Sequence, residues 1–352
     1  MTKPTRHRLL VSAALVLGLS TTSPLWAQGP TELSVLTYNI EGLPWPARSD
    51  RGEDLSRIGD QLQALRSQGR QPHVVLFEEA FSRDARAIAK KAGYRYIVDG
   101  PTASEVSKPS IADRAFRAAA RFFAGEKSGK WQSSGLRIAS DYPILDAKRI
   151  AYDTCAGMDC LANKGAVLVM VAVPGVAQPV AIVDTHLNSL NAARVSYDRS
   201  FYAYQRQIDA LSAFVHANIP AGTPFIVAGD FNAQEGRRRA YLLQQAARWR
   251  SDVKAALDLC LQAGDQCPTS NRQDLEFSHW RGRDYQLFAS GGAASLTLTS
   301  MTALFGHDEG GHMLSDHVGY TATYRIDSAS TQSAADTSNA APMRLATGSA
   351  SR

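Results

Sequence analysis

The sequence predicts an α/β fold built in layers, with mixed rather than purely parallel sheets. Apolar runs of strand length alternate along the chain with longer segments that have the period of a helix. Several neighbouring runs also lie too close together for a helical crossover. Residues 166–173 and 180–185 are separated by a Pro-Gly turn, which is typical of a hairpin.

Strands are expected at the apolar runs, several of which are continuously apolar, as in sheets that are covered on both faces. In chain order they are Leu33–Tyr38, Val74–Phe77, Leu136–Ala139, Ala166–Val173, Val180–Thr185, Pro224–Ala228, Tyr285–Ala289 and Gly319–Arg325. Helices are expected where apolar residues recur with helical spacing. These segments are Leu55–Arg66, Ala85–Ala92, Tyr197–Ala217 and Arg238–Arg248.

The two ends of the chain differ in composition from its middle. Residues 1–27 join a basic start to a short apolar stretch, which predicts a secretory signal peptide, with an uncleaved anchor as the alternative. Residues 328–352 contain almost no large apolar side chains, so we expect a disordered tail. Residues 28–327 then form one large domain of a protein that is secreted or periplasmic.

The charge of the chain is modest once the signal peptide is removed. The full chain has a net charge of +5, and Lys3, Arg6 and Arg8 leave with residues 1–27, so the remainder is close to +2. Proteins that bind polyanions usually carry a larger excess. Residues 102–130 are the exception, because basic side chains outnumber acidic ones there.

The four cysteines lie in two close pairs, Cys155/Cys160 and Cys260/Cys267. In an oxidising compartment we expect each pair to form a local disulfide. A zinc site is the alternative, although no His lies beside either pair.

Polar residues gather at the ends of the predicted strands. They are Asn39, Glu78, Glu79, His186, Asn188, Asp230, Asn232, Asp284, Asp316 and His317. In a mixed sheet the ends of some strands and the starts of others share one edge, so one cleft could collect them. Any one of them alone would be typical of a turn, so the prediction depends on their number.

The chemistry of these side chains indicates metal-assisted cleavage of a phosphate ester. Carboxylate and amide oxygens suit Mg²⁺, Mn²⁺ or Ca²⁺ better than a metal that prefers thiolates. Two histidines suit general acid–base catalysis near neutral pH.

Five motifs resemble those of the endonuclease/exonuclease/phosphatase superfamily, which includes DNase I-like enzymes, neutral sphingomyelinases and inositol phosphatases. They are Leu36-Thr37-Tyr38-Asn39-Ile40, Val75-Leu76-Phe77-Glu78-Glu79, Asp184-Thr185-His186-Leu187-Asn188, Gly229-Asp230-Phe231-Asn232 and Ser315-Asp316-His317. The match runs in order from about Leu33 to Tyr324. This resemblance implies a two-layer mixed β-sandwich flanked by helices, with the site at one edge.

The resemblance also implies a role for each residue. Glu79 would be the main metal ligand and Asn39 a supporting one, with Asp316 completing the metal or phosphate shell. The most expected metal is Mg²⁺. His317 would be the general base, and Asp284 would orient its ring.

The remaining roles concern the phosphate. Asp230 and Asn232 would position the nucleophile and the scissile phosphate, and His186 would protonate the leaving group or stabilise the transition state. Glu78 stands where the family often has Gln. It would either strengthen metal binding or point into the fold, and we favour the second.

Two segments bear on the substrate. Residues 155–166 resemble the Lys-Gly segment of sphingomyelinase-like members, so we assign Lys164, with Asn188, to substrate binding. Residues 134–144 resemble the strand that precedes it there, although Ser134 replaces the usual Asn. An ordinary surface lysine is the alternative reading of Lys164.

Residues 109–125 place four apolar side chains among basic ones: Ile111, Phe116, Phe122 and Phe123. As a helix, the segment could form an amphipathic lid on a lipid surface. It could also pack on the domain by its aromatic side, or steer nucleic acid towards the cleft.

We therefore predict a metal-dependent phosphodiesterase of sphingomyelinase type that hydrolyses sphingomyelin to ceramide and phosphocholine. A secreted nuclease and a non-catalytic binding protein on the same fold are the alternatives. We expect a monomer that acts at a phospholipid or membrane surface, with nucleic acid as the other candidate partner.

Overall fold

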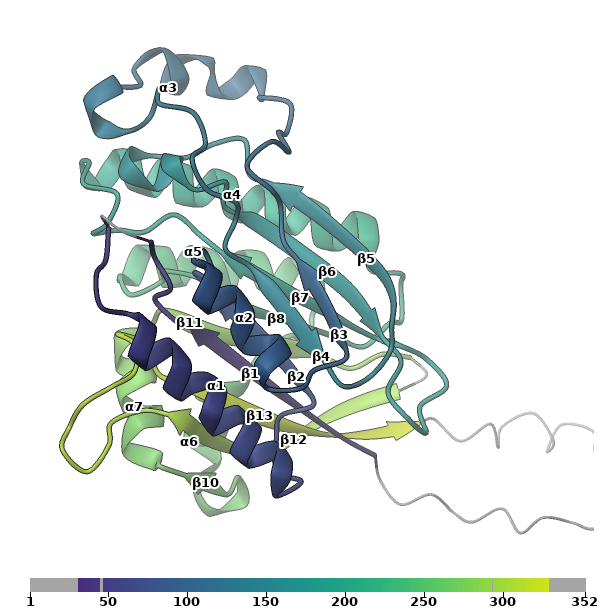
Figure 1. The fold of residues 1–352 in the computed structure, drawn as a ribbon. Helices are drawn as coiled ribbons and strands as arrows, with labels where there is room; N and C mark the ends of the chain where they lie inside the picture. Colours follow the sequence, from purple (N-terminus) through teal and green to yellow (C-terminus); the bar gives the residue numbers. More distant parts are fainter. Residues whose placement is uncertain (1–30, 45–46, 293, 329–352) are drawn as a thin grey trace, which may run out of the picture.

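The computed structural model describes residues 31–44, 47–292 and 294–328. Two mixed β-sheets pack face to face and helices cover their outer faces (Figure 1). The predicted α/β sandwich is therefore confirmed. The signal peptide predicted over residues 1–27 and, apart from Ser328, the tail predicted over 328–352 lie outside the described residues, so both stay predictions.

The first sheet has seven strands in the order β10-β12-β13-β1-β2-β4-β3. Its strands are β1 (Thr31–Asn39), β2 (Val74–Glu78), β3 (Tyr96–Asp99), β4 (Arg137–Ser140), β10 (Thr269–Ser270), β12 (Ala294–Phe305) and β13 (Gly319–Ser328). Strand β1 runs parallel to β2 and antiparallel to β13. The ends of β1 and β2 therefore meet the start of β13 at one edge of this sheet.

The second sheet has six strands in the order β5-β6-β7-β8-β11-β9. Its strands are β5 (Ile144–Ala151), β6 (Gly165–Val171), β7 (Val180–His186), β8 (Phe225–Asp230), β9 (Lys254–Ala255) and β11 (Asp284–Ala289). Strands β7 and β8 are parallel, whereas β8 and β11 are antiparallel. As in the first sheet, two strands end where a third begins.

Three layers of buried side chains explain why so many strands are continuously apolar. Val35, Leu76, Ile182 and Ile226 belong to the cluster between the sheets. On the outer faces, α1 (Gly52–Ser67) and α2 (Arg83–Lys91) bury a second cluster, while α4 (Tyr197–Asn218) and α5 (Gly236–Trp249) bury a third. A strand covered on both faces needs apolar residues at every position.

Every predicted strand and helix is present, with ends that differ by a few residues. The sequence patterns did not predict β3, β5, β12, α6 (Ala256–Ala263) or α7 (Arg272–Arg281). Most side chains of β5 are exposed, and β12 alternates apolar residues with Thr and Ser, so neither has a continuous apolar run. In the part of the chain that the structure describes, no helix is both long and apolar enough to cross a membrane.

Both predicted disulfides, Cys155–Cys160 and Cys260–Cys267, are present. All four thiols are therefore used, and the alternative of a zinc site is wrong.

Gly229 lets β8 approach β7 beside the polar edge. Its φ is 131°, and a Cβ there would lie 2.0 Å from the carbonyl oxygen of Thr185.

We expect Gly229→Ala to lower the free energy of unfolding in urea by about 2–4 kcal/mol, because the strands must separate to make room for the added methyl group. Gly236→Ala is the control, since Gly236 has no neighbour within 4 Å of its Cβ position. Equal losses in the two variants would contradict this account.

Candidate active site

A row of three polar residues crosses the edge of the second sheet. Strand pairing places His186 of β7 and Asp284 of β11 on either side of Asp230 at the end of β8. All three are buried. The Oδ2 atom of Asp230 lies 3.3 Å from His186 Nε2. Three segments distant in sequence thus form one cluster because of their strand register.

Asn39, at the end of β1, joins this row to the first sheet. Its Nδ2 donates to Glu79 Oε1 at 3.1 Å and to Asp230 Oδ2 at 3.0 Å. Its Oδ1 accepts the backbone N–H of Glu41. The amide therefore turns its nitrogen, not its oxygen, towards the carboxylates. Its role as a supporting metal ligand stays a prediction.

His317 lies just before β13, and its two ring nitrogens have different partners. Nδ1 lies 2.9 Å from both carboxylate oxygens of Asp284. Nε2 lies 3.7 Å from Asp230 Oδ2 and 3.2 Å from a guanidinium nitrogen of Arg283. Because a guanidinium can only donate, that contact requires an unprotonated Nε2, which could then accept a proton.

Opposing effects set the protonation of His317. Burial disfavours the imidazolium, but the charges of Asp284 and Asp230 outweigh it and raise the pKa of His317 to about 10. The contact with Arg283 requires the neutral ring instead. Positive charge held at the carboxylates would oppose the effect of Asp230 and favour that neutral ring.

His186 has the opposite character. Burial and the nearby charge of Lys164 lower its pKa to about 3, so its ring is neutral at physiological pH. Lys164 Nζ lies 3.0 Å from His186 Nε2 and donates to Asp159 at 3.1 Å and to the Leu187 carbonyl at 2.8 Å. The positive charge on this side of the site therefore comes from Lys164, which is buried rather than an ordinary surface lysine.

Glu79 has a carboxylate with one hydrogen bond and no direct ion pair among the described residues. It adopts a left-handed backbone conformation with a φ of 57° just after β2. Only its Oε1 has a hydrogen-bond partner among the described residues, and no cation there pairs with it. Burial raises the pKa of Glu79 to about 7, although the bond from Asn39 opposes this.

Two asparagines hold the loops that follow β7 and β8. Asn232 donates from Nδ2 to the Leu187 carbonyl, and its backbone N–H donates to Asp230 Oδ1 at 2.9 Å. Asn188 is fully buried, accepts from the backbone N–H of Ala156 and donates to the Ser189 carbonyl. Both amides are bonded to the chain itself, so their predicted contacts with substrate stay predictions.

Asp316 lies at the rim, with 46% of its side chain exposed, and pairs with Arg283 at 3.0 Å and Arg281 at 3.8 Å. The two arginines border a small pocket beside His317 and were not predicted. Their position directly before Asp284 in the sequence is the feature that could have indicated that they lie at the site. Asp159, which holds Lys164, had no such signal.

Glu78 points into the fold, as we favoured, because its side chain is fully buried and accepts from Thr37 Oγ1 at 3.0 Å. It lies beside Asp184 of β7, and burial raises the pKa of both carboxyl groups well above the usual range. The pair is therefore kept from carrying two negative charges behind the site.

The acidic groups fit a divalent cation. Asp230, Asp284 and His317 each offer a ligand atom within 4.8 Å of the others. Glu79 adds another carboxylate, which shares the Asn39 amide with Asp230 as a hydrogen-bond donor. One oxygen of Glu79 accepts no hydrogen bond from the described residues. Such oxygen-rich sites favour hard cations.

These features agree with comparisons to known proteins. The profile of the endonuclease/exonuclease/phosphatase family matches residues 36–317, and the chain belongs to this family. A sequence search among curated proteins finds no match.

Solved structures share the fold at low sequence identity. A beta toxin variant from Staphylococcus aureus with bound magnesium ions is 19% identical, with a TM-score of 0.57 over 84% of this chain and 100% of that one. Sphingomyelinase C from Streptomyces griseocarneus is 19% identical, with a TM-score of 0.56 over 83% and 99%. TDP2 from D. rerio, complexed with a single-strand DNA product, is 16% identical, with a TM-score of 0.53 over 84% and 99%.

The pKa of Glu79 predicts how metal binding depends on pH. The carboxylate binds a cation only when ionised, and its raised pKa of about 7 means that protons compete below that pH. We expect the apparent affinity for Mg²⁺ or Mn²⁺, measured by calorimetry, to fall by up to about tenfold per pH unit below 7. Glu79→Gln should bind weakly and lose this step, whereas Glu53→Gln, a surface change on α1, should keep it. An unchanged curve for Glu79→Gln would contradict the assignment.

Proposed function

We propose that this chain is an exported, divalent-metal-dependent phosphodiesterase that hydrolyses sphingomyelin to ceramide and phosphocholine. The observation that carries the proposal is the pairing of two histidines of opposite character across Asp230. His317 is held by Asp284 on one side, and a neutral His186 stands beside Lys164 on the other. One side can accept a proton while the other stabilises negative charge.

The side with His317 activates water. Nε2 of the neutral ring takes a proton as the water oxygen attacks phosphorus, and Asp284 holds the ring and stabilises the imidazolium that forms. Asp230 and Asn232, linked by a backbone hydrogen bond, shape the loop that faces the nucleophile and the phosphate.

The other side takes the leaving group. The bond between phosphorus and the ceramide oxygen breaks, and that oxygen gains negative charge until it takes a proton from a water molecule. Lys164 supplies fixed positive charge there, and the neutral ring of His186 is held against it at 3.0 Å. Of the two roles predicted for His186, stabilising the transition state suits a neutral ring better than donation from an imidazolium.

Glu79 would hold the metal, with Asn39 and Asp316 as the predicted supporting residues, and we propose Mg²⁺. When bound, the cation would offset the negative charge that develops on the phosphoryl oxygens. The buried Asp/Asp/His group and the magnesium in the beta toxin variant support this choice.

Two further findings support the proposed substrate and location. One neighbour of the same fold is a sphingomyelinase, which supports a lipid phosphodiester as the substrate. Two disulfides are typical of proteins that fold in an oxidising compartment, which favours export.

The substrate is tested by offering both candidates to the purified protein with Mg²⁺. We expect phosphocholine to be released from sphingomyelin vesicles and the release to stop when EDTA is added, while supercoiled plasmid DNA stays intact. Rapid nicking of the plasmid with no release of phosphocholine would establish the nuclease instead.

The general base is tested by His317→Ala, which should lower the rate of sphingomyelin hydrolysis by roughly 10²–10⁴-fold. Circular dichroism should be unchanged. His216→Ala is the matched control, because His216 is exposed near the end of α4. Full activity of His317→Ala would overturn the assignment.

A further inference from the structure

Residues 106–131, which we call the projecting segment, expose large apolar side chains. The segment contains η1 (Ile111–Asp113), α3 (Arg114–Ala118) and η2 (Phe122–Ala124) and lies at the end of the molecule away from β10 (Figure 1). Five of its apolar residues are between 61% and 98% exposed: Val106, Ile111, Phe122, Phe123 and Trp131. So many exposed side chains on one short segment mark a contact surface.

The segment is not the single amphipathic helix considered from the sequence, because it is broken into short turns. Phe116 alone among its four predicted apolar residues packs on the domain. Its ring stacks on Tyr202 of α4 at 4.6 Å and lies under Arg199 at 4.1 Å. Packing of the whole aromatic side on the domain is therefore wrong, since Phe122 and Phe123 turn to solvent.

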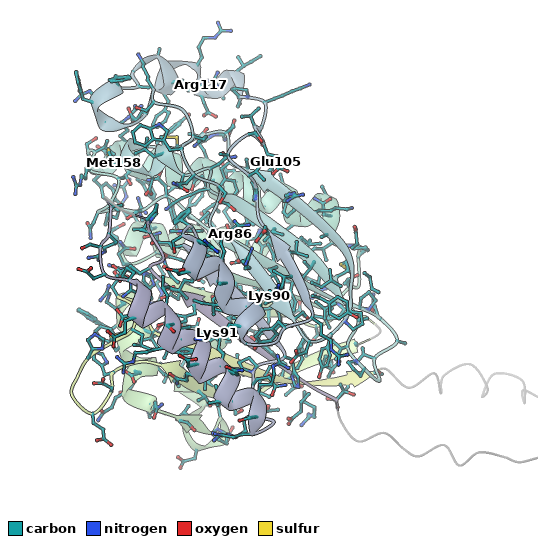
Figure 2. All side chains as sticks on the ribbon, in the orientation of Figure 1. Arg86, Lys90, Lys91, Glu105, Arg117 and Met158 are labelled. Atoms are coloured by element: carbon teal, nitrogen blue, oxygen red, sulfur yellow. A yellow bond between two sulfur atoms is a disulfide. The ribbon has the colours of Figure 1, made fainter. Side chains whose placement is uncertain are left out.

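The charged side chains of the segment also divide between the domain and the solvent. Its acidic side chains pair inward: Asp113 with Arg206 at 2.9 Å and Glu126 with Arg199 at 2.5 Å. Its basic side chains have no ion-pair partner among the described residues. Lys108, Arg114, Arg121 and Lys127 are exposed, whereas Lys130 and Arg117, which Figure 2 labels, are half-buried. The outward surface is thus both apolar and positive.

This combination favours an anionic phospholipid bilayer as the occupant. Cations at the rim suit lipid phosphates, and aromatic side chains suit the boundary with the acyl chains. Single-stranded nucleic acid could stack its bases on Phe122, Phe123 and Trp131, but Val106 and Ile111 are aliphatic and suit acyl chains better than bases.

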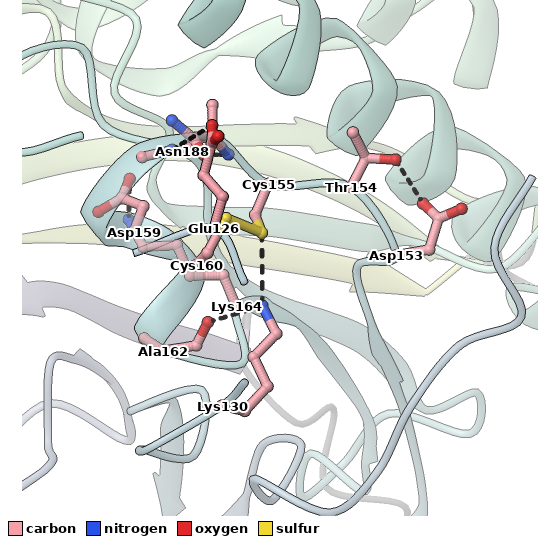
Figure 3. Close-up of a disulfide and its surroundings, with 12 residues drawn as sticks. Glu126, Lys130, Asp153, Thr154, Cys155, Asp159, Cys160, Ala162, Lys164 and Asn188 are labelled. Atoms are coloured by element: carbon pink, nitrogen blue, oxygen red, sulfur yellow. Dashed lines mark hydrogen bonds and ion pairs between the residues drawn. A yellow bond between two sulfur atoms is a disulfide. The ribbon is translucent and has the colours of Figure 1, made fainter. Parts of the chain in front are cut away.

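Hydrogen bonds tie the segment to the side of the site that carries Lys164. Glu126 accepts from the backbone N–H of Gly157 at 3.0 Å, and Lys130 donates to the Ala162 carbonyl at 3.2 Å (Figure 3). These contacts hold η3 (Gly157–Leu161), which the Cys155–Cys160 disulfide closes. Asp159 of η3 accepts from Lys164. A membrane bound to the segment would therefore lie in a fixed position relative to the leaving-group side.

We propose that residues 106–131 dock the enzyme on an anionic phospholipid surface, with Phe122 and Phe123 inserting among the lipids. The inference rests on the proposed function for the identity of the substrate. Docking is measured without substrate turnover, so the docking proposal and the proposed function can fail separately.

The experiment measures sedimentation of the full chain with vesicles of phosphatidylcholine and phosphatidylserine that lack sphingomyelin, in EDTA. We expect the wild type to bind, and Phe122→Ser/Phe123→Ser to bind at least about tenfold more weakly, because two exposed rings no longer insert. Leu145→Ser should bind like the wild type. Leu145 is 63% exposed near the start of β5, whereas Ala151, at the other end of this strand, accepts a hydrogen bond from Ser107 of the segment.

Two outcomes would overturn the proposal: no binding by the wild type, or equal binding by the double variant. Retention of single-stranded DNA by the wild type, lost in the double variant while vesicle binding is absent, would assign the segment to nucleic acid instead. Hydrolysis of detergent-dispersed sphingomyelin should be equal in the wild type and the double variant, which shows that the fold and site are intact. A wild type that sediments with vesicles but hydrolyses no sphingomyelin would refute the proposed function and leave docking supported.

Discussion

The buried carboxylate of Asp230 is the interaction on which the site depends. An ionised carboxylate away from water is costly unless donors and positive charge surround it. Donors come from both sheets: Asn39 at the end of β1 donates to Oδ2, and the backbone N–H of Asn232, just after β8, donates to Oδ1. Burial resists ionisation, but the two histidines and Lys164 hold the pKa of Asp230 below its usual range. Residues at the edges of both sheets therefore donate hydrogen bonds to the same carboxylate.

The neighbours of that charge make the two histidines beside it behave differently. His317 lies between Asp230 and Asp284, so its pKa is raised, while burial and Lys164 lower the pKa of His186 and keep its ring neutral. Behind them, the carboxyl groups of Glu78 and Asp184 are too deeply buried to ionise together. This pair therefore adds less negative charge behind the site than two ionised carboxylates would.

The leaving-group side is built from loops rather than strands, and it is held by short-range links. The Cys155–Cys160 disulfide spans few residues and fixes η3, whose Asp159 in turn holds Lys164 (Figure 3). Glu126 bonds the same element to the projecting segment. The surface that we propose for docking and the lysine that we propose for phosphate binding are therefore held by the same element.

The strands that are covered on both faces could be predicted from the amino-acid sequence, because a continuous apolar run is recognisable without knowing which strands pair with it. The disulfides and the polar residues at strand ends could also be predicted. The tertiary structure alone decided the register that places His186 and Asp284 beside Asp230, because pairing partners lie far apart in the chain. It likewise decided that edge strand β5 exists despite its exposed residues, and that Phe116 turns inward while Phe123 does not. An apolar side chain in a polar segment has no preferred direction until a neighbour such as Tyr202 offers it a surface.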